Sequence, residues 1–218
     1  ASRQQAMTAA GWSVADQQSA FDGAPFLVIP GTTTQLAGAP DLMDAAVRAK
    51  YEAYPLEALA QIAADGASSI EAALASAGDL SGFTGFSYRV PTPAGLVIIG
   101  DAGATTYDPS SDAALSGPIA VLVDIGGADI YRLATAANSS VANGVSVHVD
   151  LAGDDTYGYV LQPSALDTAA TLVSDADGRL TPTVPLNQGD GPVSASNTAR
   201  QAGARLGVAL LWDLGTGA

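Results

Sequence analysis

The chain of 218 residues contains no cysteine, one lysine and one histidine. Without cysteine the protein can form neither disulfides nor a thiolate metal site, and one histidine cannot build a typical zinc site alone. His148 lies two residues before Asp150, but no serine or cysteine stands in a motif that would complete a catalytic triad with them. The sequence therefore offers no catalytic constellation, and we expect His148 to serve in hydrogen bonding at the surface or between repeats.

Basic residues are scarce. Eight lysines and arginines stand against 22 acidic residues, so the net charge is -14, and 19 of the acidic residues are aspartate. Aspartate favours turns, helix caps and hard-cation sites, which places the negative charge mainly in loops. A surface this acidic repels phosphate backbones and anionic lipids, so nucleic acid is excluded as a partner class.

Long apolar runs are missing as well. No segment reaches the roughly 18 consecutive apolar residues that a membrane-spanning helix needs. Residues 1–5 do not resemble the start of a signal peptide, so the signal of an exported protein would already have been removed. Ala1 fits a position next to a cleavage site that ends in small residues. We therefore predict an exported bacterial protein, secreted or at the cell surface, with the periplasm as the alternative.

One motif occurs in four windows. Three complete copies align without a gap and begin 24 and 26 residues apart: LVIIGDAGATTYD (96–108), AVLVDIGGADIYR (120–132) and SVHVDLAGDDTYG (146–158). The aligned columns are Gly100, Asp124 and Asp150; Gly103, Gly127 and Gly153; and Tyr107, Tyr131 and Tyr157. A fourth, unfinished copy, LLWDLGTGA, covers 210–218. Similarity at such a period is typical of stacked units in which each copy covers its neighbour.

Each complete copy has the pattern of a strand, a glycine-rich turn and a second short strand ending near tyrosine. Val145, Val147 and Val149 alternate with polar residues, so we expect the valines to face inward and Ser146, His148 and Asp150 outward. The pattern predicts a mainly β protein with a β-solenoid-like repeat body and a small α-helical N-terminal region. A β-sandwich is the alternative, because hairpins also produce strand, turn and strand.

Two parts of the chain differ in periodicity. We predict a mostly helical N-terminal cap over 1–82 and a β-repeat domain over 83–218, with an excursion from the repeat at about 159–203. Within the cap, the expected elements are a strand over 25–31 and helices over 41–54 with Asp41 as cap, from Pro55 to a stop at Gly66, and from Ser68 or Ser69 to Gly78. Within the excursion, Asp177 and Gly178 predict a hairpin turn.

The last copy stops at Ala218, where a complete copy would continue to its second aspartate and its tyrosine. A repeat domain truncated there would expose an unpaired strand edge. We therefore expect a covering partner, which would be the remainder of the same polypeptide, a second processed chain or a symmetry-related copy.

The aspartates of the glycine-rich turns are candidate metal ligands. Glycine lets such a turn curl its carbonyl groups inward, and calcium prefers six to eight oxygen ligands. The predicted ligands are Asp124, Asp129, Asp150, Asp154 and Asp155. In the alternative interpretation these aspartates accept backbone hydrogen bonds in their own turns and form a ladder that organises the stack. Like charges stacked without a cation are costly, which favours an ion.

The segments GGADIY and AGDDTY resemble the Gly/Asp-rich turns of RTX-type calcium-binding β-rolls. They resemble more closely the DLGGDDxY-type repeats of exported bacterial proteins, over about 96–158 and 205–218. The resemblance implies a stacked β fold and calcium binding. It departs from the RTX pattern, because the copies are 24 and 26 residues apart rather than nine, and the first copy has Gly100 and Thr105 in place of the aspartates.

Other acidic groups have simpler interpretations. Asp175 and Asp177 match half of an EF-hand loop, although a plain hairpin turn is favoured. Asp154 and Asp155 resemble a glycosidase pair, but neighbouring strand residues point to opposite faces. The three aligned tyrosines are expected to form a structural ladder rather than a sugar platform. We predict a structural, adhesive or binding role, with a polysaccharide lyase or hydrolase as the alternative function.

Overall fold

A computed structural model of the protein describes residues 3–23, 41, 43–133, 135–138, 140–157, 172–174, 180–182, 201–204 and 206–215. The helices are α1 (Arg3–Ala9), α2 (Val14–Gly23), α3 (Ala45–Glu52), α4 (Leu56–Ala77) and the 3-10 helix η2 (Ala113–Ser116). The strands are β1 (Tyr88–Thr92), β2 (Gly95–Ile99), β3 (Thr106–Tyr107), β4 (Ile119–Asp124), β5 (Ile130–Tyr131), β6 (Thr135–Ala137), β7 (Val145–Asp150), β8 (Thr156–Tyr157), β9 (Leu172–Ser174), β10 (Leu180–Pro182), β11 (Gln201–Gly203) and β12 (Val208–Asp213).

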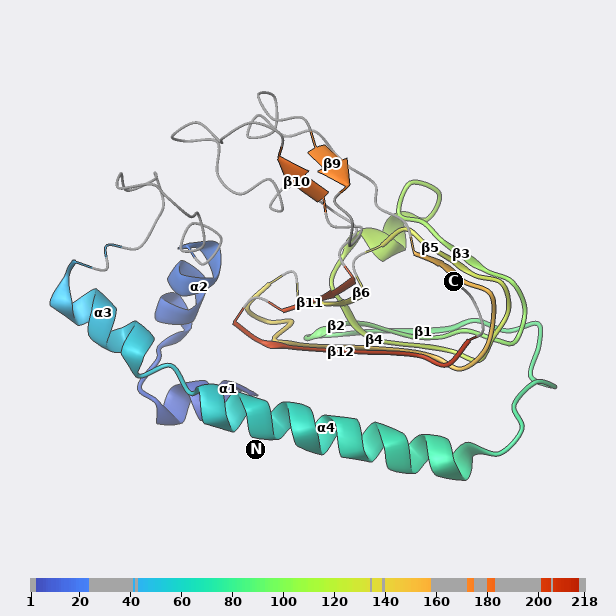
Figure 1. Cartoon of the computed structure of the whole chain (residues 1–218), viewed down its shortest axis with the longest axis horizontal. Helices are drawn as coiled ribbons and strands as arrows, with labels where there is room; N and C mark the ends of the chain where they lie inside the picture. Colours follow the sequence, from blue (N-terminus) through green and yellow to red (C-terminus); the bar gives the residue numbers. More distant parts are fainter. Residues whose placement is uncertain are drawn as a thin grey trace.

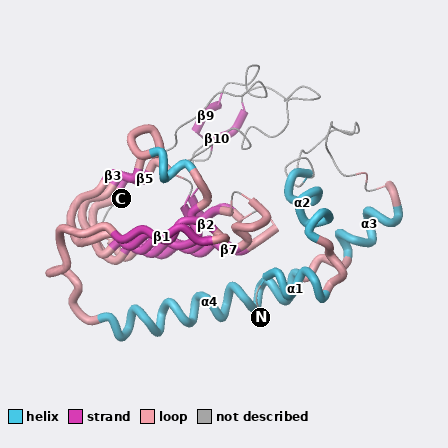
Figure 2. Tube along the Cα trace, turned by 180° about the vertical axis from the view of Figure 1, so that it is seen from behind, coloured by secondary structure: helices cyan, strands magenta, loops and turns pink. Residues whose placement is uncertain are grey.

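The largest sheet has the strand order β1-β2-β4-β7-β12. Strands β2, β4, β7 and β12 run parallel, whereas β1 forms an antiparallel hairpin with β2. A second sheet, β3-β5-β8, is parallel throughout, and β6 pairs in parallel with β11. Figure 1 shows α4 running along the five-stranded sheet, and Figure 2 shows the same arrangement from behind.

The predicted fold class is wrong. In the described part of the chain the protein is mixed α/β: the 22-residue helix α4 and three shorter α-helices accompany parallel and mixed sheets, and no β-solenoid is found there. The β-sandwich alternative also fails, because strands of neighbouring copies pair in parallel rather than as antiparallel hairpins. The difference lies in α4, a 22-residue helix that runs along the five-stranded sheet (Figure 1) and packs on it at β12, so helix and sheet share one structure.

The alignment of the copies is confirmed by the strand register. Asp124 pairs with Asp150, and Asp150 pairs with Asp213 in the fourth copy. Tyr107 pairs with Tyr131, which pairs with Tyr157. Corresponding residues of successive copies therefore lie side by side, as the gap-free alignment predicts.

The inner face of the sheet is the opposite of the one predicted. Ser146, His148 and Asp150 are fully buried, whereas Val145 and Val147 are only partly buried. The enclosed core consists mainly of aliphatic and tyrosine side chains: Ile98, Tyr107, Leu115, Ile119, Leu122, Tyr131 and Leu133. The valines lie on the outer face, where Val149 is buried as well. The alternation misled because both faces are at least partly buried, and α4 runs along the sheet and packs on β12 (Figure 1).

Helix α4 passes through Gly66, where the sequence predicted a stop and a second helix beyond it. A Cβ atom at Gly66 would lie 3.1 Å from Cδ1 of Leu210 in β12. The glycine is therefore a packing position that lets the helix approach the sheet, rather than a helix terminus. The partly or fully buried residues on this side of α4 include Leu59, Ile62, Ile70 and Leu74, at helical spacing.

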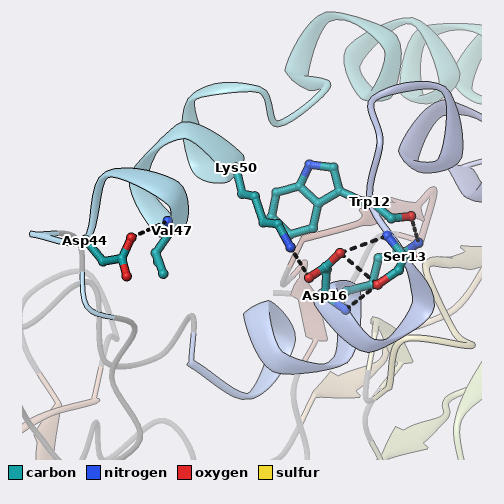
Figure 3. Close-up of polar contacts among 7 residues, drawn as sticks. Trp12, Ser13, Asp16, Asp44, Val47 and Lys50 are labelled. Atoms are coloured by element: carbon teal, nitrogen blue, oxygen red, sulfur yellow. Dashed lines mark hydrogen bonds and ion pairs between the residues drawn. The ribbon is translucent and has the colours of Figure 1, made fainter.

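Helix α3 begins later than predicted, because Asp44 caps it rather than Asp41. The Asp44 carboxylate accepts hydrogen bonds from the backbone N–H groups of Ala46 and Val47, at 2.7 and 3.3 Å. Figure 3 shows the neighbouring contact between α3 and α2, in which Lys50 pairs with Asp16. Asp16 also accepts hydrogen bonds from the backbone N–H and hydroxyl of Ser13, and its own backbone N–H donates to the Ser13 hydroxyl oxygen at 3.1 Å, so the two residues cap the N-terminus of α2.

Arg3 joins the helices to the strands. Its side chain is buried, and its Nε donates to the carbonyl of Leu206 at 2.9 Å while Nη1 donates to the carbonyl of Val141 at 3.2 Å. Nη1 also donates to Oε1 of Gln17 in α2 at 3.3 Å. One guanidinium therefore connects α1 and α2 to the loops that precede β7 and β12.

Several predicted segments lie outside the described residues, namely the strand over 25–31, most of the excursion and the turn at Asp177 and Gly178. The hairpin itself is confirmed by its strands, since β9 and β10 pair antiparallel. Within the described part of the chain, no helix combines the length and apolar character that crossing a membrane requires.

The glycine column gives a stability prediction. Gly127 has φ +131°, and a Cβ atom there would lie 2.7 Å from the backbone carbon of Gly103 in the preceding copy. We expect Gly127→Ala to lower the free energy of unfolding by at least about 2 kcal/mol, because the backbone is strained and the copies are forced apart. Chemical denaturation monitored by circular dichroism measures this. Gly117→Ala is the control, since nothing lies within 4 Å of a Cβ there, and equal losses in both variants would contradict the prediction.

Candidate metal centre

Three aspartates from two successive copies meet where the strands of the five-stranded sheet end. Asp129 lies in the turn between β4 and β5, while Asp150 ends β7 and Asp155 precedes β8. One carboxylate oxygen from each lies within 4.8 Å of the others, and all three residues are buried. The strand register explains the meeting, because it brings the second turn directly beside the third.

Two of these carboxylates are only half satisfied. Oδ1 of Asp129 accepts a hydrogen bond from the backbone N–H of Thr105 at 2.5 Å, and Oδ1 of Asp155 accepts one from the N–H of Asp129 at 2.8 Å. Oδ2 of each is buried and has no hydrogen-bond partner. Asp129 is 1% exposed and Asp155 7% exposed, so solvent does not satisfy these oxygens.

Asp150 is positioned by a tyrosine of the preceding copy. The Tyr131 hydroxyl donates to Oδ2 of Asp150 at 2.5 Å, and the backbone N–H of Ala152 donates to Oδ1 at 3.3 Å. A carboxylate oxygen can accept more than one hydrogen bond or also ligate a metal. Asp150 is thus held in place while it keeps capacity for a cation.

The other two predicted ligands lie elsewhere. Asp124 is buried, accepts the hydroxyl of Tyr107 and the backbone N–H of Gly126, and is not part of the three-carboxylate group. Asp154 is exposed and also lies outside the group. The predicted set of five therefore divides into a cluster of three, one hydrogen-bond acceptor and one surface residue.

The aligned tyrosines form a stacked interior column, as predicted. The ring centroids of Tyr107 and Tyr131 are 5.2 Å apart, and those of Tyr131 and Tyr157 are 5.0 Å apart. Tyr107 and Tyr131 are fully buried. They therefore cannot serve as a sugar platform, and their role is to fill the core and present hydroxyls to the aspartates.

The acids missing from the first copy now have a physical explanation. Tyr107 donates to Asp124 and Tyr131 donates to Asp150, so each of these aspartates accepts a hydroxyl from the preceding copy. Asp129 and Asp155 likewise accept hydrogen bonds from the preceding copy, but from its backbone N–H groups. Copy one has no preceding copy, and a Cβ atom at Gly100 would collide with the Tyr107 hydroxyl and the Asp124 carboxylate. Asp124 and Asp150 accept backbone hydrogen bonds within their own turns, as the ladder interpretation predicts, whereas the backbone donors to Asp129 and Asp155 belong to the preceding copy.

The electrostatics of the cluster favour a bound proton or cation. Burial, and then the neighbouring carboxylates, raise the pKa of Asp129 to about 7, against the hydrogen bond from Thr105. Burial also raises the pKa of Asp150 to about 7, against the hydrogen bond from Tyr131, and Asp155 and Asp124 add to the rise. None of the ion pairs found in the described part of the chain includes Asp129, Asp150 or Asp155. A cation would therefore relieve a charge that the described side chains do not balance.

His148 is not the surface or hydrogen-bonding residue that the sequence predicted. It is fully buried, its ring lies 4.6 Å from that of Tyr131, and neither ring nitrogen has a hydrogen-bond partner. Burial lowers the pKa of His148 to about 3, so the imidazole is neutral at physiological pH. His148 also lies outside the carboxylate group, which leaves an oxygen-only donor set.

The orienting tyrosines are the residues whose role the sequence analysis missed. The tyrosine recurs in copies one to three and the strand-ending aspartate in copies two to four, because the hydroxyl of one copy reaches the aspartate of the next. The signal was the coincident loss of both acids in the first copy. The parallel register of the strands shows that the tyrosine of one copy pairs with the aspartate of the next.

The chain matches no protein-family model, no curated protein and no solved structure. The resemblance to Gly/Asp-rich repeat families stays a prediction.

The raised pKa values give a prediction for cation-free protein. Asp129 and Asp150 bind protons more tightly when folded, so their contribution to stability is full below about pH 4 and is lost as pH rises through about 7. His148 acts in the opposite direction, but its contribution is already complete above pH 6.5. We expect the free energy of unfolding to fall by about 1 kcal/mol between pH 6.5 and 8 in a chelating buffer. Denaturant titrations at several pH values measure it, and a rise over this window would contradict the assignment.

The tyrosine donor gives a second prediction. Tyr131→Phe keeps the ring stacking but leaves Oδ2 of Asp150 without its hydroxyl donor. We expect a loss of about 1 to 3 kcal/mol in the free energy of unfolding, the cost of an unsatisfied buried acceptor. Tyr88→Phe is the matched control, because Tyr88 is 55% exposed. If the two variants are equally stable, the hydrogen bond does not contribute as described.

Proposed function

We propose that this is an exported structural or binding protein whose second and third repeats are locked together by a calcium ion at Asp129, Asp150 and Asp155. The observation that carries the proposal is a group of three buried carboxylates in which two oxygens have no hydrogen-bond partner. A cation converts the mutual repulsion of these groups into attraction.

The donor set supports a hard cation. All three candidate ligands are carboxylates, and calcium binds through oxygen, with carbonyl groups or water completing six to eight ligands. Zinc and copper prefer imidazole or thiolate, which this group lacks. Magnesium keeps several waters and demands octahedral geometry, which suits a buried group of three carboxylates poorly.

The ion would bridge two successive copies of the repeat. Asp129 belongs to the second copy, while Asp150 and Asp155 belong to the third. Because the ligands come from two turns, binding stabilises the contact between copies and adds to the stability of the folded state by linkage.

An extracellular setting fits this role. Extracellular calcium modules bind with dissociation constants of about 0.1 to 1 mM, which suits an ion that acts as a permanent structural element. The acidic surface and the absence of cysteine agree with such a setting. Secretion or display at the cell surface is therefore part of the proposal.

The alternative, a polysaccharide lyase or hydrolase, is not proposed. A lyase needs a free basic group beside its substrate, yet Arg89 pairs with Asp112 and Arg132 pairs with Asp108. No other observation on the described residues favours an enzyme.

Thermal unfolding with and without calcium tests the proposal. We expect millimolar calcium to raise the Tm of the wild-type protein by several degrees, and magnesium at the same concentration to have little effect. Asp129→Asn combined with Asp155→Asn should abolish the calcium-dependent shift, because both half-satisfied carboxylates are lost.

Asp154→Asn is the matched control. It removes one negative charge from an adjacent but exposed position, so it should keep the calcium shift. The ion is ruled out if isothermal calorimetry on chelator-treated wild-type protein detects no binding at millimolar calcium. It is misplaced if Asp154→Asn loses binding while the double variant keeps it.

A further inference from the structure

A groove of about 400 Å³ lies beside the candidate metal centre, between the C-terminal end of α4 and the turns that follow β4 and β7. One wall includes Leu74 of α4 and Leu80 of the segment that follows the helix. The opposite wall is formed by Ile125, Leu151 and Leu214. Its size is within the range of pockets that bind ligands, and it is large enough for two or three side chains.

The aliphatic wall arises from the repeat. Ile125, Leu151 and Leu214 each follow the aspartate that ends a strand, so they occupy equivalent positions in copies two, three and four. Backbone hydrogen bonds from Leu151 to the carbonyl of Asp124 and from Leu214 to that of Asp150, both 3.0 Å, keep this column in register. Leu214 is 51% exposed, which leaves an apolar surface facing the groove.

The charge near the groove favours a basic partner. Among the described residues that line the groove, Asp79 is the one charged residue and none is basic. Asp79 is exposed, and the chain as a whole carries a net charge of -14. A partner for this surface must supply apolar side chains for the aliphatic wall and positive charge for the acidic surroundings.

We propose that this groove binds a basic, leucine-containing peptide segment of a partner protein. Leucine side chains would fill the space between Leu80 and Leu214, and a flanking lysine or arginine would pair with Asp79. The acidic surface raises the association rate for such a segment and disfavours acidic ones.

The groove is also connected to the proposed calcium ion. Its floor includes Gly126, Gly127 and Ala152, which lie within the turns that carry Asp129, Asp150 and Asp155. An ion that fixes these turns would fix the floor of the groove, so peptide binding should tighten with calcium. This dependence rests on the proposed function, whereas the groove and its peptide chemistry do not.

Fluorescence anisotropy with a synthetic peptide tests the inference. The probe is a fluorescein-labelled peptide of alternating pairs of leucine and lysine, measured against the full chain at physiological salt with and without millimolar calcium. We expect micromolar affinity, weakened about tenfold by Leu214→Ser and also by Asp79→Asn. Leu56→Ser is the matched control, because Leu56 is 69% exposed on α4 but lies outside the groove, and it should bind like the wild type.

Two further probes separate the sources of affinity. A peptide with serine in place of leucine should bind about tenfold more weakly, and one with glutamate in place of lysine should not bind. Equal binding of the leucine and serine peptides, or equal loss in Leu214→Ser and Leu56→Ser, would overturn the groove, since only non-specific charge attraction would remain.

The role of calcium is distinguished by the same measurements. Binding that depends on Leu214 but not on calcium, together with no calcium shift in Tm, would leave the groove standing and reject the metal centre. A calcium shift in Tm without Leu214-dependent binding would do the reverse. Circular dichroism of each variant verifies that it is folded.

Discussion

The interior of the repeat body depends on a hydrogen bond from a tyrosine hydroxyl of one copy to an aspartate of the next. Tyr107 donates to Asp124 and Tyr131 donates to Asp150, both in the core. Buried hydroxyls and carboxylates are costly unless they are paired, so each pair is stable only when two copies are in the correct register. A slip of one residue would send the aspartates to the outer face and leave the hydroxyls without acceptors. The interaction therefore fixes the register, and through it the position of every turn.

The candidate metal centre follows from this register. Once the copies are aligned, Asp129 lies beside Asp150 and Asp155, and the backbone N–H groups of the preceding copy satisfy one oxygen of Asp129 and one of Asp155. The other oxygens of these two carboxylates are buried without a hydrogen-bond partner. The same turns carry the aliphatic column of the groove on their outer side. One repeated turn thus places charge inside and apolar surface outside.

Sequence reasoning found the copies and their alignment because glycine, aspartate and tyrosine recur at fixed positions. It assigned the wrong face to β7, since alternation alone does not tell whether valine or the Ser146, His148 and Asp150 series faces inward. Both faces of β7 are at least partly buried, and the Tyr131 hydroxyl satisfies the buried carboxylate of Asp150, neither of which the alternation shows. Gly66 misled for a related reason, because a glycine that ends a helix and one that admits a neighbouring Leu210 look alike in sequence. The alignment predicted the register, but not which of the five predicted ligands meet: Asp154 is exposed and Asp124 lies outside the group of three.

Because each tyrosine and its aspartate acceptor belong to successive copies, the array can gain or lose copies only at certain places. A copy with both aspartates accepts hydrogen bonds from the copy before it, and its tyrosine hydroxyl donates to the copy after it. Such a copy can therefore be duplicated in the interior of the array. The first copy, with Gly100 and Thr105, can accept nothing from a predecessor. If the first copy were placed inside the array, the tyrosine hydroxyl and a backbone N–H of the copy before it would be buried without acceptors. The array is therefore directional, with a defined first unit, and its growth by internal duplication is confined to the copies that follow it.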